Sequence, residues 1–257
     1  GIQILSGLLT LGALRQVAGY ALSPISGLKK QTKEYVLKFK NRQTLDYVTF
    51  KDIIIKGKKQ ILYLVPAQFL NSFSSSLVIL FISMLYSTEQ LGYYSAGVRL
   101  LEVPMIFITA NVSKVFYKQI SEDVNLHNTV LPKFIKISFA LLLISTLAFG
   151  TLYFIAPQFS RIVFGKGYEV AGEYIKCLCL MYLVRMVATS FTGLFTIFGK
   201  QQIELGLNVF LIVAASVVYV ISRKIDLPII SFMWLISISY SIMYLTLWLG
   251  YFSLCRT

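Results

Sequence analysis

Charged residues are scarce in this sequence, since Asp, Glu, Lys and Arg make up 14% of its 257 residues, against about 25% in soluble domains. Histidine occurs once and cysteine three times, with no cluster at metal-ligand spacing, which disfavours a zinc site and a disulfide-stapled fold. The sequence also lacks a P-loop, a Gly-x-Ser-x-Gly or His-Glu-x-x-His motif, and an Asp-x-Asp pair for a metal-bound sugar nucleotide. We therefore predict neither an enzyme nor a bound cofactor.

Apolar residues are abundant instead: they make up 56% of the chain, whose mean hydropathy is +0.72. Runs long enough to cross a bilayer cover residues 1–22, 61–86, 94–117, 137–156, 171–198, 205–222 and 229–252. Lipid offers no partner to an open strand edge, so all of them should be helices, with kinks at Pro66, Pro104 and Gly193. The fold class predicted is an all-α integral membrane protein with about seven transmembrane helices.

The few charges are mostly positive, giving a net charge of +13. Residues 23–60 hold ten Lys and Arg against three Asp and Glu, and this side is therefore predicted to be cytoplasmic. With seven spans, fifteen of the 24 cations fall on that side, four on the other and five inside helices. This asymmetry predicts a cytoplasmic C-terminus.

The basic stretch at 23–60 is long for a connection between spans. Within it, residues 45–55 carry apolar side chains at helical spacing, which predicts either an amphipathic helix on anionic membrane lipids or a solvated basic linker. Nucleic acid is not a predicted partner, because no nucleic-acid-binding fold accompanies the charge.

Cations inside the apolar runs are candidates for function. Arg185 and Arg15 lie deep in their segments, where each needs either a polar cavity with an anionic substrate or a buried ion pair. Lys114 and Lys176 lie near segment ends, so either snorkelling to the interface or the same cavity accounts for them. All four are candidate substrate-cavity residues.

Three further polar residues belong to the same prediction. Arg99 and Glu102 are three residues apart on one helix face, so they either neutralise each other or leave Glu102 as a protonatable carboxylate for ion coupling. Asn71, which precedes three serines, would suit a sugar, although Asn and Ser also serve as ordinary helix-packing groups in membranes.

Four segments resemble the second half of bacterial polysaccharide flippases, the O-antigen and exopolysaccharide translocases of the multidrug/oligosaccharidyl-lipid/polysaccharide exporter superfamily. They are LVPAQFLNS at 64–72, LGYYSAGVRLLEVP at 91–104, VFGKGYEVAG at 163–172 and GKQQ at 199–202. The order and spacing of the segments carry the resemblance, which covers about residues 44–250.

The resemblance implies a two-lobe, alternating-access transporter in the bacterial cytoplasmic (inner) membrane. It would move undecaprenyl-pyrophosphate-linked oligosaccharide outward for O-antigen, lipopolysaccharide, capsule or exopolysaccharide, and a polysaccharide polymerase is a possible partner. Residues 1–22 would be the last helix of a first lobe otherwise absent here, 23–60 the cytoplasmic link, and 61–257 the six-helix second lobe. The alternatives are a drug or metabolite exporter of the same superfamily and a non-transporting membrane scaffold for polysaccharide assembly.

Overall fold

The computed structural model describes residues 62–63, 65–126 and 129–256. The chain divides into two compact units, Gly1–Lys58 and Lys59–Thr257, and every described residue belongs to the second. The predicted helix at 1–22 with Arg15, and the basic stretch at 23–60, lie outside the described residues.

Among the described residues, each apolar run is mainly helical. The elements are α3 (Val65–Leu85), α4 (Thr88–Asn125), α5 (Leu131–Phe164), α6 (Glu169–Thr189), α7 (Gly193–Ile197), α8 (Gln201–Ile225) and α9 (Ile229–Arg256). The described residues contain no strand, and six helical stretches are long and apolar enough to span a membrane. The prediction of an all-α, multi-pass membrane protein is confirmed.

Several helices are longer than the apolar runs that predicted them. The longest, α4, has 38 residues and begins at Ser87, whose side chain accepts a hydrogen bond from the backbone N–H of Gln90. At about 1.5 Å per residue it is roughly 57 Å long, against a hydrocarbon core of about 30 Å. Polar turns therefore continue the helix beyond the apolar stretch that hydropathy detects.

The three predicted kinks have different outcomes. Pro104 lies inside α4, as expected, whereas Pro66 lies in the first turn of α3, where a proline is tolerated without bending the helix. At Gly193 the chain breaks instead of bending, since α6 ends at Thr189 and α7 begins at Gly193. A Cβ on Gly193 would lie 2.7 Å from the ring of Tyr117, so this break brings the backbone against α4.

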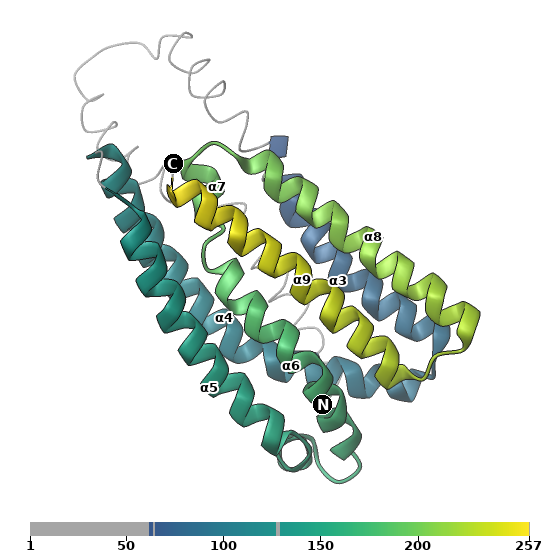
Figure 1. Cartoon of the computed structure of the whole chain (residues 1–257). Helices are drawn as coiled ribbons and strands as arrows, with labels where there is room; N and C mark the ends of the chain where they lie inside the picture. The colour runs from purple at the N-terminus through teal and green to yellow at the C-terminus, as the bar shows by residue number, and fades with distance from the viewer. Residues whose placement is uncertain (1–61, 64, 127–128, 257) are drawn as a thin grey trace, which may run out of the picture. The chain divides into compact units, whose positions relative to one another are not determined.

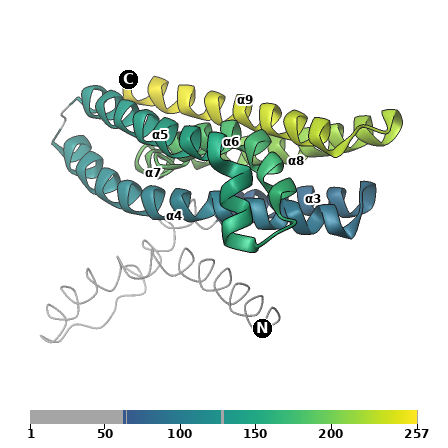
Figure 2. The ribbon, with the colours of Figure 1, turned by 90° about the horizontal axis from the view of Figure 1, so that it is seen from below.

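Helix α6 occupies the centre of this unit. It packs against α4, α5 and α9, while α3 packs against α8 and α8 against α9. Of its most apolar stretch 61% is buried, compared with 17–28% for α3, α4, α5 and α8. Figure 1 shows α6 between α5 and α9, and Figure 2 shows α3 and α4 together on the opposite side from α9. Three other helices thus pack around α6.

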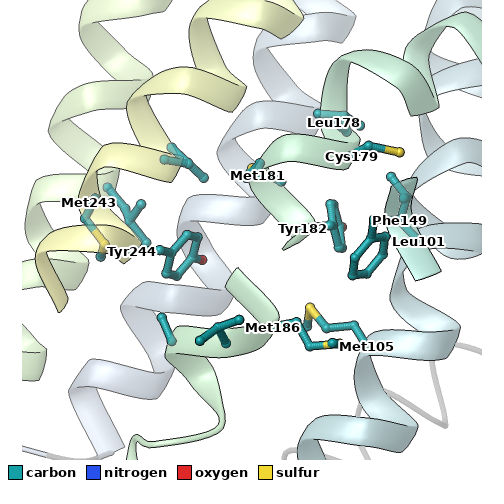
Figure 3. Packing of buried hydrophobic residues seen from close by; sticks show 14 of the residues in the cluster. Leu101, Met105, Phe149, Leu178, Cys179, Met181, Tyr182, Met186, Met243 and Tyr244 are labelled. Carbon is teal, nitrogen blue, oxygen red and sulfur yellow. The ribbon is translucent and has the colours of Figure 1, made fainter. Parts of the chain in front are cut away.

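The outer and inner faces have the polarity expected in lipid. Large apolar side chains point outward, among them Phe139, Phe154 and Ile162, while Ser145 and Ser237 are buried. Hydrogen bonds join the helices inside, such as the one that Trp248 Nε1 donates to Ser138 Oγ at 3.1 Å. Buried Met, Tyr and Phe side chains fill the spaces between α4, α5, α6 and α9 (Figure 3). The unit is held by close packing and interhelical hydrogen bonds, as membrane bundles are.

Helices α5 and α6 approach each other closely at Gly172 of α6. A Cβ there would lie 2.3 Å from the Cα of Pro157 and 2.7 Å from the backbone carbon of Ala156, both in α5. We predict that Gly172→Ala forces α5 and α6 apart, at a cost of about 1–3 kcal/mol or more. The measurement is thermal unfolding of the detergent-purified full-length protein, followed with a thiol-reactive dye that reports exposure of the buried Cys177 and Cys179 on α6.

Gly206 of α8 gives the matched control, because nothing lies within 4 Å of a Cβ built on it. The melting temperature of Gly206→Ala should equal that of the wild type or exceed it, since Ala is the better helix former. Equal melting temperatures for the two variants would contradict the tight α5–α6 contact.

Candidate functional site

Arg185 is the charged residue that the fold places deepest among those predicted. It lies near the middle of the candidate span Glu169–Ile197, on the helix that the others surround. Its backbone carbonyl accepts a hydrogen bond from Thr189 Oγ1 at 2.7 Å, within the last turn of α6. The prediction from sequence that this cation sits well inside the span agrees with the structure.

Aromatic rings surround the guanidinium of Arg185. Its Cζ lies 5.5 Å from the ring centroid of Tyr182 and 5.9 Å from that of Tyr244, both within cation–π range. Tyr244 comes from α9 and points toward α6, and Tyr182 packs beside Phe149 of α5 (Figure 3). Rings on two helices thus hold the cation in place without neutralising it.

Further polar groups lie within electrostatic range of the guanidinium. They come from three helices and, with the residues above, form what we call the Arg185 cluster: Tyr94 and Glu102 of α4, Tyr182 and Arg185 of α6, and Tyr240 and Tyr244 of α9. The phenol of Tyr240 also donates to the backbone carbonyl of Ser74 at 3.4 Å, which connects the cluster to α3.

Arg185 forms no salt bridge in the described part of the chain, although Glu102 lies within electrostatic range of it. None of the salt bridges found there includes Arg185 or Glu102, and Arg185 Nε is buried with no hydrogen-bond acceptor among the described residues. A buried donor without an acceptor costs about 1–3 kcal/mol. Both alternatives from the sequence, a substrate-binding cation and a buried ion pair, therefore stay predictions.

The other predicted cations do not gather around Arg185. Lys176 Nζ forms a salt bridge with Glu173 at 2.9 Å on the same helix. Arg99 and Lys114 of α4 are exposed, and within the described ranges no salt bridge joins Arg99 to Glu102. Glu102 itself is half-buried and belongs to the Arg185 cluster. The structure brings one predicted cation and the predicted coupling carboxylate together.

Asn71 lies on α3, one turn before Ser74. Its backbone carbonyl accepts hydrogen bonds from Ser74 Oγ at 2.8 Å and Ser75 Oγ at 3.4 Å. Since the carbonyl of Ser74 accepts from Tyr240, this part of α3 reaches the Arg185 cluster through α9. The half-buried side chain of Asn71 stays a predicted contact for a sugar.

Glu204 is a buried carboxylate. From sequence it was predicted to lie in the cytoplasmic connection between the spans 171–198 and 205–222. It lies in the first turn of α8 and is 2% exposed. Its Oε1 accepts from Gln68 Nε2 of α3 at 3.2 Å, while Oε2 is buried with no partner among the described residues. The hydroxyl of Tyr251 on α9 is likewise buried without a partner in that part of the chain, within electrostatic range of Glu204. Such a carboxyl group is suited to holding and releasing a proton.

A signal for Glu204 is present in the sequence. The buried face of α8 recurs at alternating steps of three and four residues along Gln201, Glu204, Asn208, Leu211, Ala215, Val218 and Ser222. Hydropathy predicts that this span begins at residue 205, after Glu204. The spacing of three and four residues shows instead that the inward-facing side of the helix extends back to Gln201. The tyrosines of the Arg185 cluster carried no comparable signal, because their convergence depends on how α4, α6 and α9 pack.

A metal centre is not formed by the residues described. No group of three or more His, Cys, Asp and Glu side chains within residues 62–63, 65–126 and 129–256 is arranged to hold a metal ion. The three cysteines are free and buried. The chemistry open to the Arg185 cluster is binding of an anion by a cation, with phenols available as hydrogen-bond donors.

Comparison with known proteins finds similarity to polysaccharide biosynthesis proteins. The amylovoran biosynthesis protein AmsL of Erwinia amylovora is 21% identical over 160 residues, which cover 62% of this chain and 40% of that protein. The aligned region thus spans less than half of the relative. No solved structure matches the chain. A profile of the family described as "Polysaccharide biosynthesis protein" matches residues 33–173, more than half of the sequence. The chain belongs to this family of polysaccharide biosynthesis proteins.

Proposed function

We propose that this chain is part of a transporter that flips undecaprenyl-pyrophosphate-linked oligosaccharide repeat units from the cytoplasmic to the outer leaflet of the bacterial cytoplasmic membrane. The observation that carries the proposal is Arg185, a cation near mid-span on the central helix, held by tyrosine rings and without a salt bridge among the described residues. Membership of a polysaccharide biosynthesis family and the multi-pass helical fold support a transporter-type protein.

The chemistry of the guanidinium suits the charged part of such a substrate. Its planar fork of N–H donors matches phosphate oxygens, and it keeps its charge in an apolar environment. The Arg185 cluster adds phenol hydroxyls, which hydrogen-bond to phosphate or sugar oxygens. Arg185 therefore binds the pyrophosphate in this proposal, and the polar groups of α3 around Asn71 face the first sugars.

Transport by alternating access requires a second lobe and a source of energy. In this proposal that lobe precedes residue 23, and the basic stretch at 23–60 joins the two lobes. This stretch and the C-terminus lie on the cytoplasmic side of the membrane. Glu102 of the Arg185 cluster is the carboxylate proposed for ion coupling, and the buried Glu204 is a second candidate.

The test of this function is a direct assay of leaflet crossing. In spheroplasts of the source bacterium lacking the gene, lipid-linked repeat units carrying a radiolabelled sugar should accumulate and stay protected from periodate added outside. Expression of the full-length protein should make them periodate-sensitive. Equal sensitivity with and without the protein would overturn the flippase proposal, and restored drug resistance alone would favour the exporter alternative.

A transporter should expose the Arg185 cluster to solvent, whereas a static scaffold should not. The three native cysteines are buried, so background labelling is low. We predict that cysteine introduced at Glu102 or Arg185 reacts with a membrane-impermeant thiol reagent, whereas cysteine at the buried Leu178 does not. Protection of all three positions from both sides of the membrane would favour the scaffold.

A further inference from the structure

A second set of polar and aromatic side chains gathers at the opposite end of the bundle from the C-terminus. Here α4 begins and a short loop joins α5 to α6 (Figure 1). A cavity of about 250 Å³ lies between them, lined by Glu89, Gly92, Tyr93, Lys166, Gly167 and Tyr168, which we call the tyrosine pocket. Two of the segments that carried the family resemblance, 91–104 and 163–172, meet in this cavity.

Two aromatic rings form one side of the tyrosine pocket. The rings of Tyr93 and Tyr168 are perpendicular, with centroids 5.4 Å apart, and Phe164 supports Tyr168 at 5.5 Å. In an edge-to-face pair the ring that presents its edge keeps both faces free of its partner. Pyranose rings pack their C–H faces on such surfaces, which suit an apolar face bordered by hydroxyls.

The polar lining supplies both acceptors and donors. Glu89 Oε1 accepts from the Tyr93 hydroxyl at 2.7 Å, which leaves the second carboxylate oxygen for another donor. Lys166 is exposed, and no salt bridge involves it in the part of the chain that the structure describes. A carboxylate on one side disfavours a purely anionic ligand, and the charges together disfavour an apolar one. Hydroxyl groups, which both donate and accept, fit this mixture.

The loop that bears Lys166 has a defined shape. Gly165 and Gly167 both have φ of 98°, a conformation that side chains other than glycine rarely adopt. The N–H of Gly167 donates to Glu169 Oε2 at 2.9 Å, and Arg161 Nε lies 3.5 Å from the other oxygen of Glu169. These contacts fix Lys166 and Tyr168 opposite α4, so the pocket is formed by the fold and not by one flexible side chain.

Gly92 leaves space open on the α4 side of the pocket. Nothing lies within 4 Å of a Cβ built at this position, although Gly92 is inside a helix. The cavity of about 250 Å³ is smaller than the roughly 300–1,000 Å³ of sites that enclose drug-sized molecules. It matches one sugar ring and not a whole repeat unit.

We infer that the tyrosine pocket is a monosaccharide-binding subsite. This assignment rests on the proposed function for its role, which is to hold one sugar residue of the oligosaccharide at the outer end of the transporter. The pocket lies at the end away from Lys200 and the C-terminus, and charge asymmetry predicts that end to be outside the cell.

The test uses saturation-transfer NMR on the full-length protein in nanodiscs, with D-glucose, D-galactose and D-mannose as probes. At least one hexose should give a signal with the wild type. Gly92→Leu fills the pocket, and Tyr168→Ala removes a ring, so each should weaken the affinity for that hexose, measured by titrating the signal, at least about tenfold, which corresponds to about 1.4 kcal/mol. Gly150→Leu in α5 is the matched control, since it adds the same side chain where nothing lies within 4 Å, and it should keep the signal.

The outcomes separate this inference from the flippase proposal. Absence of a signal from all three hexoses with folded wild-type protein, or an equal signal in Gly92→Leu, overturns the subsite whatever the transport assay shows. Arg185→Ala should keep the hexose signal while losing transport, because Arg185 is not among the residues that line the tyrosine pocket. A signal lost in Arg185→Ala but kept in Gly92→Leu would place sugar binding at the cluster and overturn the subsite.

Discussion

Replacing Arg185 with Ala should lower surface polysaccharide by roughly 10- to 100-fold while the protein still inserts in the membrane. The half-buried guanidinium is the cation that the proposed pyrophosphate contact uses, and its buried Nε has no acceptor among the described residues. Hydrogen bonds to charged groups contribute about 1.5–3 kcal/mol, and each 1.4 kcal/mol is a tenfold change in binding. Removing the side chain removes a buried donor without an acceptor and also the cation–π contacts with Tyr182 and Tyr244, so the membrane level of the variant is measured together with its output.

Three variants make this result specific. Arg185→Lys keeps the charge but loses the planar fork, so polysaccharide output should be intermediate. Tyr244→Phe keeps the ring beneath the guanidinium and should retain most activity, and Arg99→Ala removes an exposed cation from α4 and should have little effect. Output is measured by quantifying extracted polysaccharide at matched membrane levels of each variant. Wild-type output from Arg185→Ala would exclude the substrate role of Arg185.

Helix positions were predictable from sequence because lipid imposes one dominant requirement. A span must satisfy its own backbone hydrogen bonds and be apolar over about 20 residues, and both properties are local. The errors occur where hydropathy is the wrong measure. Helix α4 continues through polar turns at both ends, and the run at 171–198 separates into α6 and α7, with the backbone at Gly193 close to Tyr117 of α4.

The candidate site was only partly predictable. The depth of Arg185 follows from its place in one apolar run, but the tyrosines around it come from α4, α6 and α9. Which helix is central, and which faces meet, depends on contacts such as the approach of Gly172 to Pro157. Likewise, Lys176 was a candidate for the same cavity or for snorkelling to the interface, and the structure pairs it with Glu173 on its own helix.

Glu204→Gln should abolish or strongly reduce polysaccharide export without lowering the melting temperature. The substitution keeps an oxygen that accepts the hydrogen bond from Gln68 Nε2, and it removes a carboxyl group whose second oxygen is buried without a partner among the described residues. An amide can neither take up nor release a proton. If Glu204 exchanges a proton as α3 and α8 move against each other, the variant is fixed in one state.

The control variants separate this role from a structural one. Glu173→Gln removes a carboxylate from an exposed salt bridge worth about 0–1 kcal/mol and should leave both export and melting temperature unchanged. Gln68→Leu removes the donor to Glu204 and should destabilise the protein by about 1–3 kcal/mol, because both carboxyl oxygens then lack a partner in the described structure. Normal export from Glu204→Gln, together with an unchanged or higher melting temperature, would show that Glu204 only joins α8 to α3. Loss of export with retained stability would show that transport requires the protonatable carboxyl group of Glu204. From sequence, this residue was predicted to lie outside the membrane, between the spans 171–198 and 205–222.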